Sequence, residues 1–194
     1  MDNFIYEIEN VLPKEICEII IKRYQNDDRK TESLIGSGVV DKTVRNSNIL
    51  SFSDYEDWKD VDSIMSDIIC VGSNKYTEHI KENNIPEVAK HYAKHFTTLV
   101  DEGYHIQEYK QDGCYTWHHD HNNITKVRDF SFVLYLNTLE ENEGGCTEFL
   151  NGKKIRPVQG KLLIFPSSWQ FVHQSNTVKN GATKYVIVTW AKNE

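Results

Sequence analysis

The fold of this chain is decided in the stretch Tyr109-Lys-Gln-Asp-Gly113-Cys-Tyr115-Thr-Trp-His118-His-Asp120. Its second half predicts a short strand over residues 114–120. Because side chains alternate along a strand, His118 and Asp120 share one face of it, while Trp117, His119 and His121 share the other. An HxD pair on a strand therefore presents two metal ligands side by side.

A third ligand of the same kind stands later in the chain. His173 lies 53 residues after Asp120, in the strand-like Phe171-Val172-His173-Gln174. Two histidines and one carboxylate hold one face of a non-haem Fe(II) and leave the other face open for substrate and O2. A lone HxD is more often part of an ordinary polar surface strand, so the surrounding pattern has to support this interpretation.

From residue 104 onward the pattern is one of short strands separated by turn signals. Asn151-Gly152 and Asn180-Gly181 are typical of hairpin turns. Eight short, mostly antiparallel strands predict a jelly roll or a barrel-like sandwich. We expect them at residues 104–110, 114–120, 129–137, 146–150, 153–158, 161–165, 170–176 and 183–191.

The first half of the chain reads as helical support for that sheet. Apolar spacing predicts a helix over residues 13–25, a second that includes Trp58 to Ile69, and a third that includes Val88, Tyr92 and Phe96. Residues 30–55 predict short strands, at 38–40 and 48–50, and a lid loop. The predicted class is α+β with a mainly β core: a single domain over 1–194, with support at 1–98 and a jelly-roll core at 99–193.

Composition narrows the function classes. A chain of 194 residues can bury one well-formed core, and no apolar run approaches the about 20 residues of a membrane span. The start lacks the pattern of a signal peptide, and four scattered cysteines predict reduced thiols, so we expect a soluble, cytoplasmic protein. The net charge of -7 disfavours a nucleic-acid partner. The charge is unevenly distributed: residues 1–104 have a net charge of -8, and residues 105–194 have a net charge of +1.

The strand half resembles the prolyl 4-hydroxylase-like branch of the Fe(II)/2-oxoglutarate dioxygenases, and the resemblance extends over nearly the whole chain. The family signature Y-x-x-G-x-x-Y-x-x-H-x-D is approximated from Tyr109 to Asp120, with Asp112 at the expected glycine position. The family motif R-x-x-T-x-x-x-Y-L-N is matched from Arg128 to Asn137, with Ser131 in place of the threonine. The matching segments are Arg128-Asp-Phe-Ser131-Phe-Val-Leu-Tyr135-Leu136-Asn137, Gly144-Gly145-Cys146-Thr147-Glu148-Phe149, Gly160-Lys161-Leu162-Leu163-Ile164-Phe165, His173, Lys184-Tyr185 and Trp190.

The resemblance implies a role for individual residues. The iron ligands would be His118, Asp120 and His173. Lys184 would pair with the distal carboxylate of 2-oxoglutarate, and Tyr135 would donate a hydrogen bond to the same carboxylate. Tyr109 and Trp190 would line the cosubstrate pocket. The residues facing the prime substrate would be Arg45, Tyr115, Trp117 and Arg128.

Lys179 competes with Lys184 as the carboxylate anchor. Lys184 is preferred because it lies six residues before Trp190 on one predicted strand, which puts both on the same face. Its separation from His173, 11 residues, is about one longer than the family pattern, which predicts a small bulge near Asn180-Gly181.

The implied activity is hydroxylation of an unactivated C–H bond with consumption of O2 and 2-oxoglutarate and release of succinate and CO2. Asp120 favours hydroxylation over halogenation, because halogenating relatives lack that carboxylate. Fe(II) and 2-oxoglutarate are the implied cofactor and cosubstrate, with ascorbate as an optional reductant. A prolyl residue in a peptide or protein is the favoured substrate. A free amino acid or another small molecule stays open, as does a non-catalytic metal-binding jelly roll.

Several further features carry weaker hypotheses. His119 and His121 could replace a ligand, but the strand alternation turns them away. His91 and His95 stand at i and i+4 on a predicted helix, a zinc-compatible spacing without a third ligand. Cys114 and Cys146 are expected to pack rather than react. The compact chain is similar to microbial or viral members of the family, and we expect a monomer or weak dimer.

Overall fold

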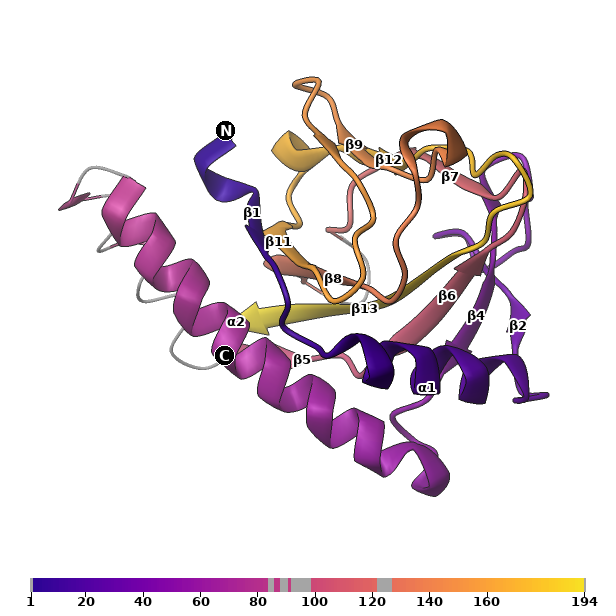
Figure 1. The fold of residues 1–194 in the computed structure, drawn as a ribbon. Coiled ribbons are helices and arrows are strands. Elements are labelled where there is room, and N and C mark those ends of the chain that lie inside the picture. The colour runs from indigo at the N-terminus through magenta and orange to yellow at the C-terminus, as the bar shows by residue number, and fades with distance from the viewer. Residues whose placement is uncertain (1, 84–85, 88–90, 92–98, 122–126, 194) are drawn as a thin grey trace.

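The larger of two antiparallel sheets forms the middle layer of the protein (Figure 1). The computed structural model describes residues 2–83, 86–87, 91, 99–121 and 127–193. Within these ranges the larger sheet has the order β1-β11-β8-β13-β6-β4-β2, and β5 also pairs with β13. Its strands are β1 (Tyr6–Ile8), β2 (Thr31–Glu32), β4 (Asn48–Ser51), β5 (Leu99–Asp101), β6 (His105–Tyr109), β8 (Phe130–Tyr135), β11 (Leu162–Pro166) and β13 (Lys184–Asn193).

The smaller sheet lies against one face of the larger one and has the order β10-β9-β12-β7-β3. Its strands are β3 (Arg45–Asn46), β7 (Cys114–His118), β9 (Thr147–Phe149), β10 (Lys154–Ile155) and β12 (His173–Ser175). Two facing antiparallel sheets with crossing connections form the expected jelly roll.

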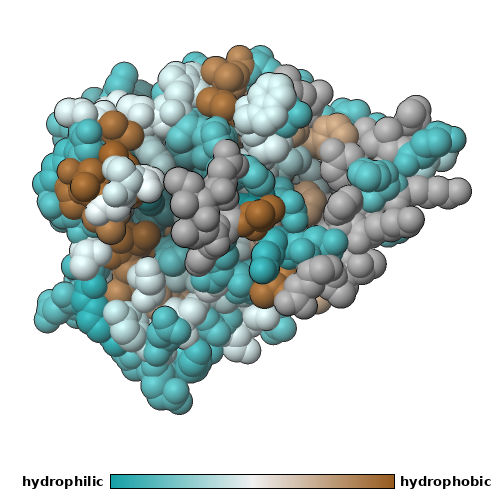
Figure 2. Space-filling model, turned by 180° about the vertical axis from the view of Figure 1, so that it is seen from behind, coloured by the Kyte–Doolittle hydropathy of each residue, from teal (hydrophilic) through white to brown (hydrophobic). Residues whose placement is uncertain are grey.

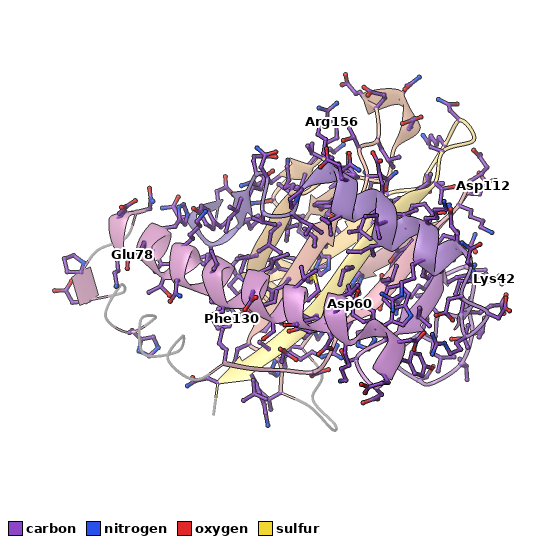
Figure 3. All side chains as sticks on the ribbon, turned by 60° about the horizontal axis from the view of Figure 1, so that its bottom comes forward. Lys42, Asp60, Glu78, Asp112, Phe130 and Arg156 are labelled. Carbon is purple, nitrogen blue, oxygen red and sulfur yellow. The ribbon has the colours of Figure 1, made fainter. Side chains whose placement is uncertain are left out.

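Two helices, α1 (Lys14–Gln25) and α2 (Lys59–Asn83), cover the other face of the larger sheet (Figures 1 and 3). The buried face of α1 consists of Cys17, Ile20 and Tyr24. α2 crosses the sheet closely at Gly72, where a Cβ atom would come within 2.7 Å of Leu162 Cδ2. Short 3-10 helices complete the fold at η1 (Asp2–Phe4), η2 (Glu56–Trp58), η4 (Glu141–Glu143) and η5 (Trp169–Phe171).

Side chains on the two faces of β13 belong to two different apolar cores. Tyr185, Ile187 and Ala191 belong to the core between the helices and the larger sheet. Val186 and Val188, on the opposite face of the strand, belong to the core between the two sheets. The cavity described below lies on this second side, so the helices support the sheet from behind.

The structure confirms all eight strands expected after residue 104, as β6 to β13. It also confirms the helix at 13–25 and extends the second one to Asn83. The strand predicted at 38–40 is wrong: Val39 lies in a bend, Val40 lies in irregular backbone, and both are exposed, without a neighbouring strand among the described residues. The third predicted helix falls mainly on residues outside the described ranges.

The surface seen from behind is largely hydrophilic, with separate apolar patches (Figure 2). None of the helices within the described residues combines the length and the apolar run needed to cross a bilayer.

Candidate metal centre

The three predicted ligands meet at one end of the smaller sheet. His118 ends β7 and His173 begins β12, and the two residues are direct cross-strand partners. Their ring centroids are 4.3 Å apart. Asp120 lies two residues beyond the end of β7, because the strand expected to reach residue 120 ends at His118. The connection after β7 therefore carries the carboxylate across to face both rings.

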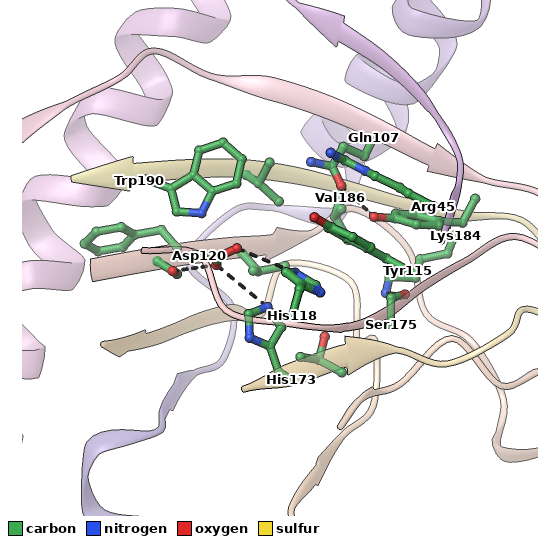
Figure 4. Close-up of a pocket in the computed structure, with 16 residues that line it drawn as sticks. Arg45, Gln107, Tyr115, His118, Asp120, His173, Ser175, Lys184, Val186 and Trp190 are labelled. Carbon is green, nitrogen blue, oxygen red and sulfur yellow. Dashed lines mark hydrogen bonds and ion pairs between the residues drawn. The ribbon is translucent and has the colours of Figure 1, made fainter. Parts of the chain in front are cut away.

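The donor atoms of this triad point at a common centre (Figure 4). His118 Nε2 lies 3.5 Å from Asp120 Oδ1, and His173 Nε2 lies 3.7 Å from Asp120 Oδ2. One ligand atom from each residue lies within 4.8 Å of the others. Two imidazoles and one carboxylate at these separations form a donor set that suits a six-coordinate divalent iron.

Both histidines are held in the tautomer that a metal requires. His118 Nδ1 lies 2.7 Å from the Thr116 carbonyl oxygen, and His173 Nδ1 lies 3.0 Å from the Phe171 carbonyl oxygen. A carbonyl only accepts hydrogen bonds, so each Nδ1 carries the proton and donates it. Each Nε2 is left with a lone pair directed at the centre of the triad, as is usual for metal-ligating histidines.

Electrostatics keep the triad in its ligand form. Burial, and then the neighbouring His173, lower the pKa of His118, which stays neutral at physiological pH. Burial alone would raise the pKa of Asp120, but His173, His118 and the Ser131 hydroxyl together lower it, so the carboxyl is ionised. Neutral imidazole and ionised carboxylate are the forms that bind a metal.

A short chain of hydroxyl groups orients the carboxylate. The Ser131 hydroxyl donates to Asp120 Oδ2 at 2.7 Å, and Ser131 Oγ lies 2.7 Å from Ser167 Oγ. The Trp190 side chain also hydrogen-bonds to this carboxylate, so two side chains fix its orientation. Ser131 stands in a family motif, yet its contact with Asp120 could not be read from the sequence.

Lys184, the predicted carboxylate anchor, begins β13 and is 2% exposed. Its Nζ donates to the Gly145 carbonyl at 2.8 Å and to Ser175 Oγ at 2.7 Å, and lies 5.0 Å from the centroid of the Tyr109 ring. Among the described residues no carboxylate lies within ion-pair distance of it. Burial lowers the pKa of Lys184 to about 7. Such a buried cation is suited to meet an anion from outside the chain.

Lys184 and the triad line the same cavity between the sheets (Figure 4). Trp190 also lines it, as the alternation of β13 predicts. Sequence reasoning did not single out Gln107, Thr147 or Ser175, which it could have found only from their positions on predicted strands. The full lining comprises Arg45, Gln107, Tyr109, Tyr115, His118, Asp120, Ser131, Phe132, Val133, Thr147, His173, Ser175, Lys184, Val186, Val188 and Trp190.

A bulge brings Tyr115 into this cavity. His173 pairs with His118 but Ser175 pairs with Tyr115, so β7 has one extra residue between the two pairs. Tyr115 and His118, three residues apart, therefore both face inward, with ring centroids 3.5 Å apart. The bulge was expected near Asn180-Gly181. There the structure has positive φ angles of 55° and 74°, in a turn before β13.

Two other tyrosines differ in their placement. Tyr109 lines the cavity and donates from its hydroxyl to Gln107 Oε1 at 2.7 Å. Tyr135 is fully buried behind Thr147, with the two hydroxyl oxygens 2.7 Å apart, and it is not part of the cavity lining. The centroid of the Tyr135 ring nevertheless lies 5.9 Å from Lys184 Nζ, so Tyr135 stands next to the predicted carboxylate anchor.

The four residues expected to face the prime substrate separate into three groups. Arg45 and Tyr115 line both the inner cavity and an outer cleft next to it. Arg128 borders only the outer cleft, where its guanidinium is paired with Glu102 at 2.8 and 3.0 Å and stacked 3.8 Å from the centroid of a Trp190 ring. Trp117 is 44% exposed and lines neither space.

The competing candidates lie elsewhere. His119 and His121 border the outer cleft and do not line the inner cavity. Lys179 lines a separate surface groove. His95 lies outside the described residues, so the spacing with His91 cannot be placed. Cys114 and Cys146 are free and half-buried.

Comparisons with known proteins agree with this geometry. Residues 104–192 match the family model described as the 2OG-Fe(II) oxygenase superfamily. No curated protein matches the chain.

Solved structures of similar shape cover 98% of the chain at low sequence identity. They include a viral collagen prolyl hydroxylase from Paramecium bursaria Chlorella virus-1 in complex with 2OG, at 20% identity over 97% of that chain with a TM-score of 0.67. A Trichoplax adhaerens prolyl hydroxylase in complex with a hypoxia inducible factor peptide fragment has 18% identity over 84% of its chain and a TM-score of 0.75. A Pseudomonas putida prolyl-4-hydroxylase has 17% identity over 93% of its chain and a TM-score of 0.65. These likenesses show a shared fold.

Proposed function

We propose that this chain, of which residues 104–192 match the 2OG-Fe(II) oxygenase family model, hydroxylates an unactivated C–H bond of a prolyl residue in a peptide or protein. One observation carries the proposal. A His-Asp-His triad and a buried lysine without an acidic partner among the described residues line one cavity. The first suits a divalent iron and the second suits the distal carboxylate of a dicarboxylic cosubstrate.

His118, Asp120 and His173 would hold Fe(II), and Lys184 would hold 2-oxoglutarate. When bound, this pair supplies the oxidising power: one O2 and one 2-oxoglutarate are consumed, the C–H bond becomes C–OH, and succinate and CO2 leave. The contribution of the chain is to bind and orient these groups and to limit access of water.

Individual side chains carry that contribution. The Thr116 and Phe171 carbonyls hold the two imidazoles in position, and the Ser131 hydroxyl orients the Asp120 carboxylate. Lys184 lies on the same strand as Val186 and Val188, whose side chains form an apolar wall between the lysine and the triad end. Such a wall strengthens the attraction between Lys184 and a bound carboxylate, because it keeps the local dielectric low.

A prolyl substrate is proposed because the motif context is that of prolyl 4-hydroxylases and because the three solved structures named above are prolyl hydroxylases. The outer cleft bordered by Arg45 and Tyr115 opens next to the triad and offers a place for a peptide segment. A free amino acid is the second candidate, favoured by the uncompensated charge of Arg45 discussed below.

The test is anaerobic addition of Fe(II) and 2-oxoglutarate to the purified protein, followed by admission of air. We expect a weak visible charge-transfer band, then succinate, and a gain of one oxygen atom on a proline-containing peptide. His118→Ala should abolish the band, whereas the matched control His119→Ala should retain it, because His119 does not face the triad. A folded wild-type protein without the band and without succinate would refute the enzymatic proposal.

A further inference from the structure

Arg45 is a buried cation whose charge the described part of the chain does not neutralise. It begins β3 and is 9% exposed. Its guanidinium lies 4.7 Å from the centroid of the Tyr115 ring and donates from Nη1 to the Leu34 carbonyl at 3.1 Å. Its buried Nε has no hydrogen-bond partner. No carboxylate of the described residues lies within 4.0 Å of it.

The other four arginines, all within the described residues, behave differently. Each lies within 4.0 Å of at least one carboxylate: Arg23 of Asp60, Arg29 of Asp27 and Asp57, Arg128 of Glu102, and Arg156 of Glu140. Three of them are exposed or half-exposed, where water would solvate an unpaired charge. The arginine without an acidic partner is thus the most buried of the five, which is the reverse of what a purely structural role favours.

The position of Arg45 relates this charge to the reaction centre. Its side chain borders both the inner cavity and the outer cleft, which has a volume of about 420 Å³. One aromatic ring separates the guanidinium from the metal ligand His118, since Tyr115 stacks on that imidazole at 3.5 Å. A group bound by Arg45 would therefore lie close to the carbon that is oxidised.

The remaining charges around the cleft leave Arg45 uncompensated. Arg128 is neutralised by Glu102. Asp120 is a metal ligand in the proposed function. Lys184 is the separate anchor for the cosubstrate, at the Ser175 side of the inner cavity. Because the described residues offer Arg45 no carboxylate, its counter-ion would come from the prime substrate.

We propose that the prime substrate carries a carboxylate within about one or two residues of the oxidised carbon, a reach of about 3.5 Å per residue, and that Arg45 binds it. This inference rests on the proposed oxygenase function. Two sources share the chemistry: an Asp or Glu side chain next to the target residue in a peptide, and the α-carboxylate of a free amino acid or chain end. A guanidinium can bind either with two parallel hydrogen bonds.

The experiment measures binding to the protein loaded anaerobically with Fe(II) and 2-oxoglutarate, so that no turnover occurs. The probes are matched acid and amide pairs: short blocked peptides with Pro-Asp or Pro-Asn, peptides with Pro-Glu or Pro-Gln, and free proline or prolinamide. We expect the acid member of at least one pair to bind about 10- to 100-fold more tightly, the range for hydrogen bonds to charged groups. The pair that shows the preference identifies the source of the carboxylate.

Variants assign the preference to Arg45. Arg45→Gln should remove it, and Arg45→Lys should retain part of it, because the charge is kept but the planar geometry is lost. Lys42→Gln is the matched control: it removes one positive charge from an exposed residue at the periphery, paired with Glu32, and should change nothing (Figure 3). Circular dichroism checks that each variant is folded.

Three results would overturn the inference: equal binding of acid and amide, a preference that survives in Arg45→Gln, or no binding of any acid probe. The proposed function has its own readout, because succinate formation from 2-oxoglutarate in air does not depend on the acid and amide pairs. Succinate formation without an acid preference would refute the role of Arg45 alone. Absence of succinate would refute the oxygenase proposal.

Discussion

The larger sheet buries two lysines in different surroundings. Lys161, next to β11 at the edge formed with β1, is 6% exposed and lies 2.8 Å from Glu7 and 3.2 Å from Glu9. Lys184, at the start of β13, is 2% exposed and meets a carbonyl, a hydroxyl and aromatic rings. The fold supplies its own anions for the first lysine. We infer that the second is kept for the anion of a ligand.

The same contrast separates two arginines near the outer cleft. Arg128 is held by Glu102 in a two-point ion pair, whereas Arg45 contacts the Leu34 carbonyl and the Tyr109 side chain and has no carboxylate within 4.0 Å in the described part of the chain. Burial of a charge alone does not distinguish a binding residue from a structural one. The presence or absence of an internal counter-ion does.

The strongest test of this comparison replaces Lys184 with methionine, which keeps the volume and removes the charge. Affinity for 2-oxoglutarate should fall about 100-fold, because a charge-assisted hydrogen bond in a buried site is lost. The free energy of unfolding should stay equal or rise, since an unpaired buried charge is removed. Titration of the charge-transfer band and urea denaturation measure the two quantities.

The control for this variant is Lys179→Met, which changes a lysine in a separate groove. It should leave 2-oxoglutarate affinity unchanged. The opposite outcome, a loss with Lys179→Met and none with Lys184→Met, would move the carboxylate anchor to Lys179.

The second prediction concerns pH. Burial lowers the pKa of Lys184 to about 7, and a bound carboxylate favours the protonated form. Below pH 7 the lysine is already charged, so 2-oxoglutarate binds with full affinity. Above pH 7 binding must take up a proton, and affinity should fall about tenfold per pH unit. Anaerobic titrations between pH 6 and 9, and calorimetry in buffers of different ionisation enthalpy, measure the slope and the proton uptake.

Lys184→Met should lose this slope, because no lysine remains to titrate. A wild-type affinity that does not change over the same range would show that Lys184 is already protonated without a ligand, and would weaken the contrast with Lys161.

The third prediction extends the comparison to the buried anion Asp120. Its neighbours are the Ser131 hydroxyl, the Trp190 side chain and two imidazoles, and among the described residues no lysine or arginine side chain lies within ion-pair distance of it. Ser131→Ala removes the hydroxyl that occupies Oδ2. Fe(II) affinity should fall about tenfold, the lower end of the range for losing an outer-shell partner of a metal ligand.

Ser131→Thr keeps a hydroxyl at the same position and should restore most of that affinity. Metal binding is followed by competition with a coloured chelator, which does not depend on turnover. Equal Fe(II) affinity in Ser131→Ala and the wild type would remove Ser131 from the metal site.

The smallest expected effect belongs to the paired lysine. Lys161→Met should lower the free energy of unfolding by about 1 kcal/mol, because Glu7 and Glu9 are partly exposed and water replaces much of the lost interaction. Affinity for 2-oxoglutarate should stay the same. A fall in that affinity comparable to the fall in Lys184→Met would show that the internal counter-ion does not separate the two lysines.

Much of the fold and of the triad was readable from the sequence. The strands after residue 104 are local patterns with a period of two, and the same period put Lys184 and Trp190 on one face of β13. The inward orientation of Tyr115 was not readable, because it depends on a bulge defined by the pairing of β7 with β12. The contact between the Tyr135 and Thr147 hydroxyls was not readable either, because it depends on how β8 packs against β9.

The sequence by itself determined the kinds of chemistry available: two imidazoles and a carboxylate in an HxD…H order, buried strands, and cations at positions typical of the family. The tertiary structure decided which of those cations are free to act. Lys161 is neutralised by Glu7, 154 residues away, and Arg128 by Glu102, 26 residues away. Ion pairing depends on distance in space, which no local pattern encodes, and so only the folded chain separates Lys184 and Arg45 from the cations that are already paired.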